Sequence, residues 1–314
     1  MRKGFFKKMA ALVLAVVTTM TMFTGCGGAG STSASTKSIT IQGGNTEGDL
    51  DPAGVALGMF IQYSRLCLEP LITYDSDGKV GKAMAESYEE SSDGLTWTFH
   101  LRKDAKWSDG SAVTSADFVN TIKRSLDGKT SKSIYADMLS PIVGATEAYA
   151  GTASVDNVGV TAPDDYTIEF KLVKPCSYFL KLIAMQCCYP SKAGIATNEN
   201  ETWYTDPKTN LANGAIYMTE YVPGQYHKLK KNPNYYDADK VYLEDITVKF
   251  RDDATAAVSA YKTNEVDFAT NLPAYVMSEY QGKSDLVLQP NITTRFILFN
   301  VTKAPFNNDK VRRA

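Results

Sequence analysis

The sequence has little of what enzymes and metalloproteins use for chemistry. It has two histidines, His100 and His227, which lie far apart and outside any ligand-spaced motif. It has no GxSxG, HExxH or P-loop pattern, and no GxGxxG that follows a strand and opens a helix. We therefore predict no catalytic residue, no metal site and no cofactor. Paired carboxylates stay an open alternative, because acidic residues are plentiful and their proximity in space cannot be read from a sequence.

The five cysteines form no recognisable framework. Cys67, Cys176, Cys187 and Cys188 show neither disulfide-framework nor zinc-site spacing. Cys187 and Cys188 are adjacent, and adjacent cysteines rarely pair with each other because the geometry is strained. We expect unpaired thiols at these four positions, with a bond from Cys176 to Cys187 or Cys188 as the alternative. The fifth, Cys26, has a different context.

Neither sign of charge dominates the chain. The formal net charge is −2 over 314 residues, with no basic excess that would hold phosphate backbones. Nucleic acid is therefore not expected as a partner. Four cations, Arg2, Lys3, Lys7 and Lys8, lie in the first 25 residues, which contain no acid. The basic charge is thus concentrated at the N-terminus.

The N-terminal segment has the pattern of an export signal. Basic residues 1–8 precede an apolar run of 15 residues, 9–23, which is too short to span a bilayer but suits the core of a signal peptide. The sequence TGC, ending at Cys26, comes next and resembles a bacterial lipobox, with Phe23 where that pattern usually has Leu. The resemblance implies a lipoprotein signal peptide over 1–25 and a diacylglycerol on Cys26, whose two acyl chains suffice for stable anchoring. The alternative is an ordinary secretory signal in which Cys26 has no role.

A short polar segment separates this signal from the rest of the chain. Residues 26–37 contain Gly, Ala, Ser and Thr besides Cys26 and one Lys. Such a composition cannot bury apolar surface, so we expect a flexible tether. A tether behind a lipid would let a folded body reach a neighbouring membrane protein.

Beyond residue 37, strand and helix patterns alternate. Alternating or short apolar runs between turn signals predict strands over 38–42, 97–101, 166–172, 226–230, 241–250 and 294–301. Apolar residues at helical spacing predict helices over 55–68, 177–185 and 253–262, and a further helix after the capping-box-like start at Thr114. This interleaving indicates an α/β or mixed α+β body.

One stretch carries a specific family resemblance. Residues 83–110, AMAESYEESSDGLTWTFHLRKDAKWSDG, closely resemble the signature region of the family-5 extracellular solute-binding proteins. The resemblance covers nearly everything after residue 38, with further matching segments at 113–126 (VTSADFVNTIKRSL), 213–217 (NGAIY), 222–237 (VPGQYHKLKKNPNYYD), 250–268 and 303–314 (KAPFNNDKVRRA). We interpret the signature as packing and turn chemistry, with Trp97 and Trp107 in the core, a turn at 108–110 and a helix cap at Thr114. The competing interpretation is that the signature forms the ligand site.

The resemblance implies a fold class, the two-lobed α/β clamp of the periplasmic binding proteins, of the class II or cluster C type. In such a clamp the ligand lies between the lobes and hinge closure buries it. Residues 38–292 would form a nearly complete first lobe, and 293–314 the hinge-proximal start of a second lobe that is mostly missing. On this expectation, the chain alone binds peptide weakly or not at all.

The resemblance also implies a function, the capture of oligopeptides for delivery to the permease of an ABC transporter. The expected location is the extracytoplasmic face of a bacterial cell membrane, through the lipid anchor. A monomer and no enzymatic activity are expected. The alternatives are another solute, such as a nickel chelate, haem or sugar, and a lipid-anchored extracellular hydrolase.

Six ligand-contacting positions are implied by the resemblance through alignment of motifs. They are Ala56, Leu57, Gly58, Tyr135, Phe296 and Leu298. The first three would lie on a strand that pairs with the backbone of an extended peptide, as an added strand does. The helical spacing that begins at residue 55 conflicts with this in part, unless the segment enters a helix. Leu298 is apolar where some relatives have an acid, so we expect no pairing with a peptide terminus there.

Overall fold

The computed structural model describes residues 37–43, 50–54, 59–74, 77–131, 133–200, 202–251, 253–270, 272–288 and 296–313. The chain divides into two compact units, Met1–Ser38 and Ile39–Ala314, and the second is the folded body. The predicted signal peptide, Cys26 and most of the predicted tether lie outside the described residues. Among the residues that are described, no helix has both the length and the apolar character needed to cross a membrane.

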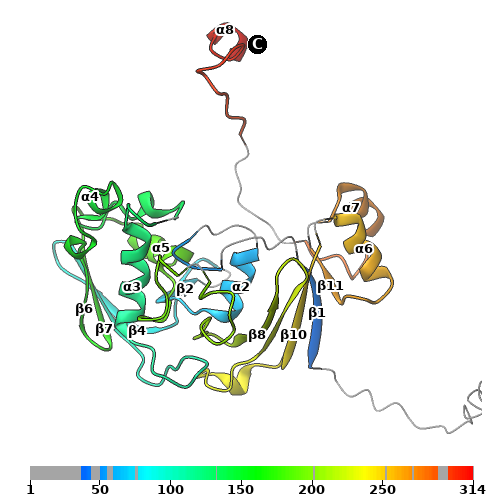
Figure 1. Ribbon diagram of the computed structural model, residues 1–314, viewed down its shortest axis with the longest axis horizontal. Coiled ribbons are helices and arrows are strands. Elements are labelled where there is room, and N and C mark those ends of the chain that lie inside the picture. The colour runs from blue at the N-terminus through cyan, green and yellow to red at the C-terminus, as the bar shows by residue number, and fades with distance from the viewer. Residues whose placement is uncertain are drawn as a thin grey trace, which may run out of the picture. The chain divides into compact units, whose positions relative to one another are not determined.

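A four-stranded antiparallel sheet occupies the first half of the body, in the order β4-β5-β7-β6 (Figure 1). Its strands are β4 (Ala85–Glu90), β5 (Thr96–Leu101), β6 (Val160–Asp164) and β7 (Thr167–Lys171). As the alternation predicts, Trp97, Phe99 and Leu101 of β5 are buried and their neighbours are half-buried. One face of this sheet therefore forms a core.

Helices cover that face. They are α3 (Ser115–Leu126), α4 (Ala145–Tyr149), α5 (Phe179–Ile183) and the short 3-10 helices η1 (Ala136–Leu139), η2 (Val155–Asn157) and η3 (Gln186–Cys188). α3 lies against the sheet and buries Phe118, Ile122 and Leu126 completely (Figure 1). The predicted helix over 177–185 is shorter than expected, because the chain turns at Ala184 into the segment that leads to η3.

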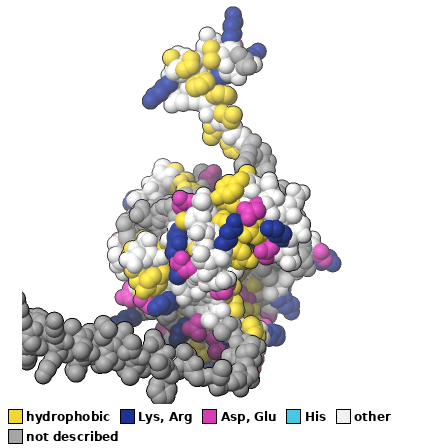
Figure 2. Space-filling model, turned by 90° about the vertical axis from the view of Figure 1, so that its right-hand side faces the viewer, with side chains coloured by type: hydrophobic (Ala, Val, Ile, Leu, Met, Phe, Trp, Pro, Cys, Tyr) yellow, Lys and Arg dark blue, Asp and Glu magenta, His cyan; other side chains and the backbone are white. Residues whose placement is uncertain are grey.

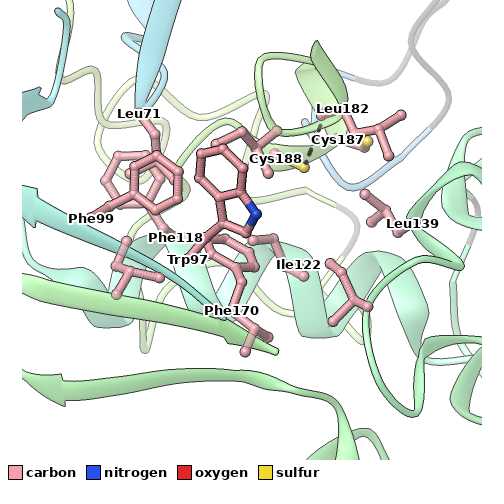
Figure 3. Packing of buried hydrophobic residues seen from close by; sticks show 14 of the residues in the cluster. Leu71, Trp97, Phe99, Phe118, Ile122, Leu139, Phe170, Leu182, Cys187 and Cys188 are labelled. Carbon is pink, nitrogen blue, oxygen red and sulfur yellow. Dashed lines mark hydrogen bonds between the residues drawn. The ribbon is translucent and has the colours of Figure 1, made fainter. Parts of the chain in front are cut away.

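The resulting larger cluster of buried apolar residues is rich in aromatic side chains. Figure 3 shows its centre, where Leu71, Trp97, Phe99, Phe118 and Phe170 lie together. The ring of Phe99 meets the ring of Phe170 edge to face, with 5.7 Å between centroids. Aromatic pairs in this geometry add stability beyond the area that they bury.

The signature residues are packing and turn residues, as interpreted from the sequence. Trp107 is fully buried, and its Nε1 donates to Asp117 Oδ2 at 3.0 Å. The same oxygen accepts from the backbone N of Thr114 at 2.9 Å, so the capping box of α3 also holds the indole. In the turn, Ser111 N donates to Asp109 Oδ1 at 2.9 Å and Gly110 has a φ of 87°, a value that favours glycine.

A five-stranded sheet, in the order β11-β1-β10-β9-β8, is the second large sheet of the body. Its strands are β1 (Ser38–Gly43), β8 (Ile216–Val222), β9 (Tyr226–Lys231), β10 (Asp245–Phe250) and β11 (Phe268–Ala269). β8, β9 and β10 form an antiparallel meander, whereas β1 pairs in parallel with β11. Helix α2 (Met59–Cys67) contacts β8 and contributes Tyr63 and Cys67 to a smaller cluster of buried residues.

The remaining elements are short. They are β2 (Ile72–Tyr74), β3 (Val80–Lys82), η4 (Ala238–Lys240), α6 (Ala254–Lys262), α7 (Ala274–Tyr280) and α8 (Asp309–Arg313). The predicted helix over 253–262 is confirmed, and Asp253 caps it by accepting from the backbone N of Thr255 and Ala256 at 2.7 and 3.1 Å. Cys67, Cys176, Cys187 and Cys188 are all buried free thiols, so the alternative disulfide is wrong.

The predicted strand over 294–301 is wrong for the part that the structure describes. Residues 296–300 have no regular secondary structure, and Phe296, Ile297 and Leu298 are 72%, 80% and 84% exposed. The apolar run has strand-like composition, but a strand also needs a neighbour that pairs its backbone groups. No strand of the described part of the chain pairs with this segment.

Candidate functional site

The structure describes three of the six predicted ligand residues, Tyr135, Phe296 and Leu298. Ala56, Leu57 and Gly58 lie outside the described residues. Phe296 and Leu298 belong to the exposed C-terminal segment. No described hydrogen bond or ring contact joins Phe296 or Leu298 to Tyr135, so a joint role in a cleft stays a prediction.

Tyr135 lies at the surface of the larger cluster of buried residues. It is the residue before η1, is half-buried, and packs against the buried apolar residues beneath it. Its backbone N donates to Ser133 Oγ at 3.4 Å, and its backbone O accepts from Met138 N at 3.1 Å. Ile134 and Met138 beside it are 50% and 43% exposed. Tyr135 therefore has a hydrogen-bonded backbone beside exposed apolar side chains, and its contact with a ligand stays a prediction.

A buried ion pair lies at the segment that precedes Ala56. Arg124 Nη2 of α3 donates to Asp51 Oδ1, and the two side chains are only 8% and 9% exposed. Burial raises the pKa of the Asp51 carboxyl, and the Arg124 charge opposes that rise. The sequence does not predict this pair, since an arginine in the last turn of a helix is ordinarily exposed and no local pattern marks Arg124 as buried.

A second polar cluster joins the regions of the two sheets. Tyr236 Oη donates to Glu69 Oε1, and the Arg102 guanidinium lies over the Tyr236 ring. Burial raises the pKa of Glu69, with hydrogen bonds from Tyr236 and Tyr235 opposing the rise. Burial, together with the hydrogen bond to Glu69, raises the pKa of Tyr236 to about 12. Glu69 is thus held by hydroxyl donors, an arrangement that fixes structure.

A cavity of about 230 Å³ opens beside Glu69. Arg65, Thr73, Tyr189 and Tyr235 line it together with Glu69, so it carries one cation, one acid and three hydroxyl groups. The cavity is suited to holding a small polar group or water.

The imidazole of His227 and the thiol of Cys67 both lie beside Tyr63. His227 is 1% exposed between the rings of Tyr63 and Phe250, and burial lowers its pKa to about 4. Burial also raises the pKa of Cys67, which keeps this thiol protonated and unreactive. Within the part of the chain that the structure describes, no group of three or more His, Cys, Asp or Glu residues could hold a metal ion.

Charge is mixed over the surface. On the face of the body shown in Figure 2, Lys and Arg side chains are interspersed with Asp and Glu side chains, whereas the C-terminal segment shows Lys and Arg side chains alone. The ion pairs Lys249–Glu265 and Lys262–Glu279 are instances, at 3.2 and 2.9 Å.

Comparison with known proteins identifies relatives over most of the chain. The model of the bacterial extracellular solute-binding proteins, family 5 Middle, matches residues 79–314. The periplasmic oligopeptide-binding protein OppA of Escherichia coli is 32% identical over 291 residues, which are 91% of this chain and 53% of that protein. The probable deoxycholate-binding periplasmic protein YgiS of the same organism is also 32% identical, over 85% of this chain and 50% of that protein.

Solved structures agree with the sequence relatives. The substrate-binding domain of an oligopeptide ABC transporter from Bacillus anthracis superposes with a TM-score of 0.74 at 31% identity, covering 80% of this chain and 48% of that one. Listeria monocytogenes OppA bound to peptide gives 0.73 at 27% identity, covering 80% and 49%. The chain spans about half the length of the relatives it matches.

These similarities confirm the fold class expected from the sequence, that of the two-lobed periplasmic peptide-binding proteins. The family model covers well over half of the chain, and it begins just before the signature residues 83–110. The chain belongs to the bacterial extracellular solute-binding proteins, family 5.

Proposed function

We propose that this protein is the extracytoplasmic substrate-binding lipoprotein of a peptide ABC transporter. It captures oligopeptides between two lobes and delivers them to the membrane permease, without chemical change. The observation that carries the proposal is the agreement between the family match and relatives named as oligopeptide- or dipeptide-binding proteins over 79–91% of this chain. In this proposal, residues 38–292 are the first lobe and 293–314 begin the second.

Native mass spectrometry of the full-length protein, purified from a bacterial host, tests the ligand. The expected result is a set of added masses that tandem fragmentation identifies as intact peptides. Peptides that are recovered cleaved would instead support the extracellular hydrolase. Titration calorimetry of residues 27–314 then tests the lobe assignment, because a ligand site built from two lobes needs both. Peptide binding at micromolar affinity or tighter by that fragment would contradict it.

Anchoring through Cys26 is the second part of the proposal. Labelling cells with an azide-bearing palmitate should tag the wild-type protein and leave Cys26→Ser untagged, since the thioether needs the Cys26 sulfur. Cys176→Ser is the matched control, because Cys176 is a buried free thiol of the body. A wild-type protein without label would contradict the lipoprotein assignment and leave an ordinary secretory signal.

A different solute is the second candidate, and one relative favours it. The similarity to a probable deoxycholate-binding protein equals that to OppA in identity, at 32%. Titrating the same full-length preparation with deoxycholate and with a synthetic pentapeptide separates the candidates. Saturable heat with deoxycholate and none with the peptide would replace the peptide proposal.

A further inference from the structure

The cavity beside Glu69 has a wall that is held in place by hydrogen bonds. The backbone N and O of Glu69 are both bound by the side chain of Asn213, at 2.9 and 3.0 Å. The next residue, Gly214, also lines the cavity and donates its backbone N to Cys67 O at 2.9 Å. A Cβ at Gly214 would lie 2.9 Å from the carbonyl carbon of Cys67, so only glycine fits this approach. The end of α2 and the start of β8 are thus locked together, and the cavity between them is preformed.

The cavity carries an unpaired cation. Arg65 lies in the last turn of α2, and its side chain is exposed. Within the part of the chain that the structure describes, its guanidinium has no hydrogen bond and no ion pair. Burial raises the pKa of Tyr189, and the charge of Arg65 opposes this rise, which indicates that the two side chains are near each other. Arg65 and Tyr189 therefore offer N–H and O–H donors to the same cavity.

The cavity also carries an acid without a cationic partner. The Glu69 carboxylate accepts hydrogen bonds from the hydroxyl groups of Tyr236 and Tyr235. The neighbouring cation, Arg102, pairs instead with Asp104 at 2.7 Å and lies over the Tyr236 ring. Among the described residues, Glu69 forms no salt bridge. Burial raises the pKa of Glu69, so a cation that enters the cavity would compensate a partly desolvated carboxylate.

A small zwitterion complements this arrangement. Its carboxylate matches a guanidinium, which presents a planar fork of donors, and its ammonium group matches an acceptor-only carboxylate such as Glu69. The volume of about 230 Å³ is below the range of about 300–1,000 Å³ that is usual for drug-sized ligands. Leu66, Leu68 and Ala83 complete the lining, so a small apolar side chain would also find apolar contacts.

We propose that this cavity binds a free amino acid, with the ligand's carboxylate at Arg65 and its ammonium group at Glu69. The inference goes beyond peptide capture and does not depend on it. Tyr135, Phe296 and Leu298, the predicted ligand residues that the structure describes, do not line this cavity.

Calorimetric titration of the full-length protein with L-alanine, propionate and ethylamine tests the charge requirement. Propionate keeps only the carboxylate of alanine, and ethylamine keeps only its ammonium group. We expect saturable binding of L-alanine, about tenfold or more tighter than that of either analogue, because each analogue loses one charge-assisted contact.

Two variants assign the charges to residues. Arg65→Gln should weaken L-alanine binding about tenfold and abolish the preference for L-alanine over ethylamine. Glu69→Gln keeps an oxygen for the Tyr236 hydroxyl and should abolish the preference for L-alanine over propionate. Lys228→Gln is the matched control, because Lys228 pairs with Glu220 at 2.7 Å on an exposed part of the five-stranded sheet, and it should leave L-alanine binding unchanged.

The Tm of each variant is measured first, and all titrations are made far below it. Arg65 is exposed, so Arg65→Gln remains informative even where Glu69→Gln does not fold. A wild-type protein that binds no L-alanine would overturn the inference, and so would L-alanine binding that Arg65→Gln leaves unchanged. Equal affinity of the wild type for L-alanine and propionate would overturn it as well, because the carboxylate alone would then suffice. Peptide capture would stand after any of these results, since native mass spectrometry tests it separately.

Discussion

The two sheets of the body are assembled from the chain in different ways. The four-stranded sheet takes all its strands from residues 85–171, and each strand pairs antiparallel with its neighbours. The five-stranded sheet combines a local meander over 216–250 with β1 and β11, which come from residues 38–43 and 268–269. Closing the pairing of Ile41 with Phe268 orders a much longer loop than any pairing in the four-stranded sheet.

The clusters of buried residues at the two sheets differ as well. The larger cluster contains a run of ring contacts, including Trp97 with Phe179 at 5.6 Å and Phe170 with Phe179 at 5.3 Å between centroids. The smaller cluster lies against the buried imidazole of His227, whose Nδ1 has no hydrogen-bond partner in the structure. We infer that the four-stranded sheet is the more stable part and that the five-stranded sheet gives way first under stress.

The largest expected effect comes from the centre of the larger cluster. Phe99→Ala should lower the free energy of unfolding by about 3–5 kcal/mol, because it removes a fully buried ring and leaves a cavity. Urea unfolding measures this change. Leu229→Ala, at a buried position of β9, is the counterpart in the other sheet, with an expected loss of about 2–5 kcal/mol. A larger loss for Leu229→Ala than for Phe99→Ala would contradict the inference that the four-stranded sheet is the more stable part.

Acid should act on the five-stranded sheet through His227. Burial lowers the pKa of His227 to about 4, whereas an unfolded histidine has a pKa of about 6.5. The unfolded chain therefore binds a proton first, so this contribution to stability is complete above pH 6.5 and falls as the pH drops toward 4. The free energy of unfolding falls by about 3 kcal/mol through this effect.

The measurement compares urea unfolding of the wild type and His227→Gln between pH 7 and pH 4. The raised pKa values of Asp51 and Glu69 change the free energy of unfolding with pH in the opposite direction, but they do so equally in both proteins. The difference between the two profiles therefore isolates the contribution of His227. Hydrogen exchange should show that β8, β9 and β10 lose protection before β5 and β7. Parallel profiles for the two proteins would contradict the prediction.

The smallest expected effect lies at the edge of the five-stranded sheet. Asp253→Ala removes the cap of α6, so the backbone N of Thr255 and Ala256 lose their acceptor. We expect faster amide exchange at these two positions and a fall in the urea midpoint smaller than for Phe99→Ala or Leu229→Ala. Asp253→Asn is the matched control, since it keeps a side-chain oxygen. Unchanged exchange in Asp253→Ala would show that the cap does not hold the first turn.

Much of the fold is predictable because it depends on local patterns. The alternation at Trp97, Phe99 and Leu101 marks a half-buried strand, and the cap at Asp253 marks the start of a helix, whatever the rest of the chain does. The segment 296–301 fails for the complementary reason. Its apolar composition suits a strand, but pairing depends on a partner that no local pattern supplies.

The candidate site is likewise predictable in part. The resemblance selects Tyr135, and the structure shows it packed against the larger cluster. The pair Asp51–Arg124 was not predictable, because the two residues are 73 positions apart and only packing makes either one buried. Burial of a charge is a property of the assembled body.

The sequence alone determined the strand and helix patterns, the signature that identifies the family, and the absence of a recognisable catalytic motif. Each of these depends on residues that are close together along the chain. Only the tertiary structure decided which polar residues are buried, which thiols stay unpaired, and that Asp51 pairs with Arg124. The physical reason is that desolvation and pairing depend on neighbours that folding brings together from distant positions.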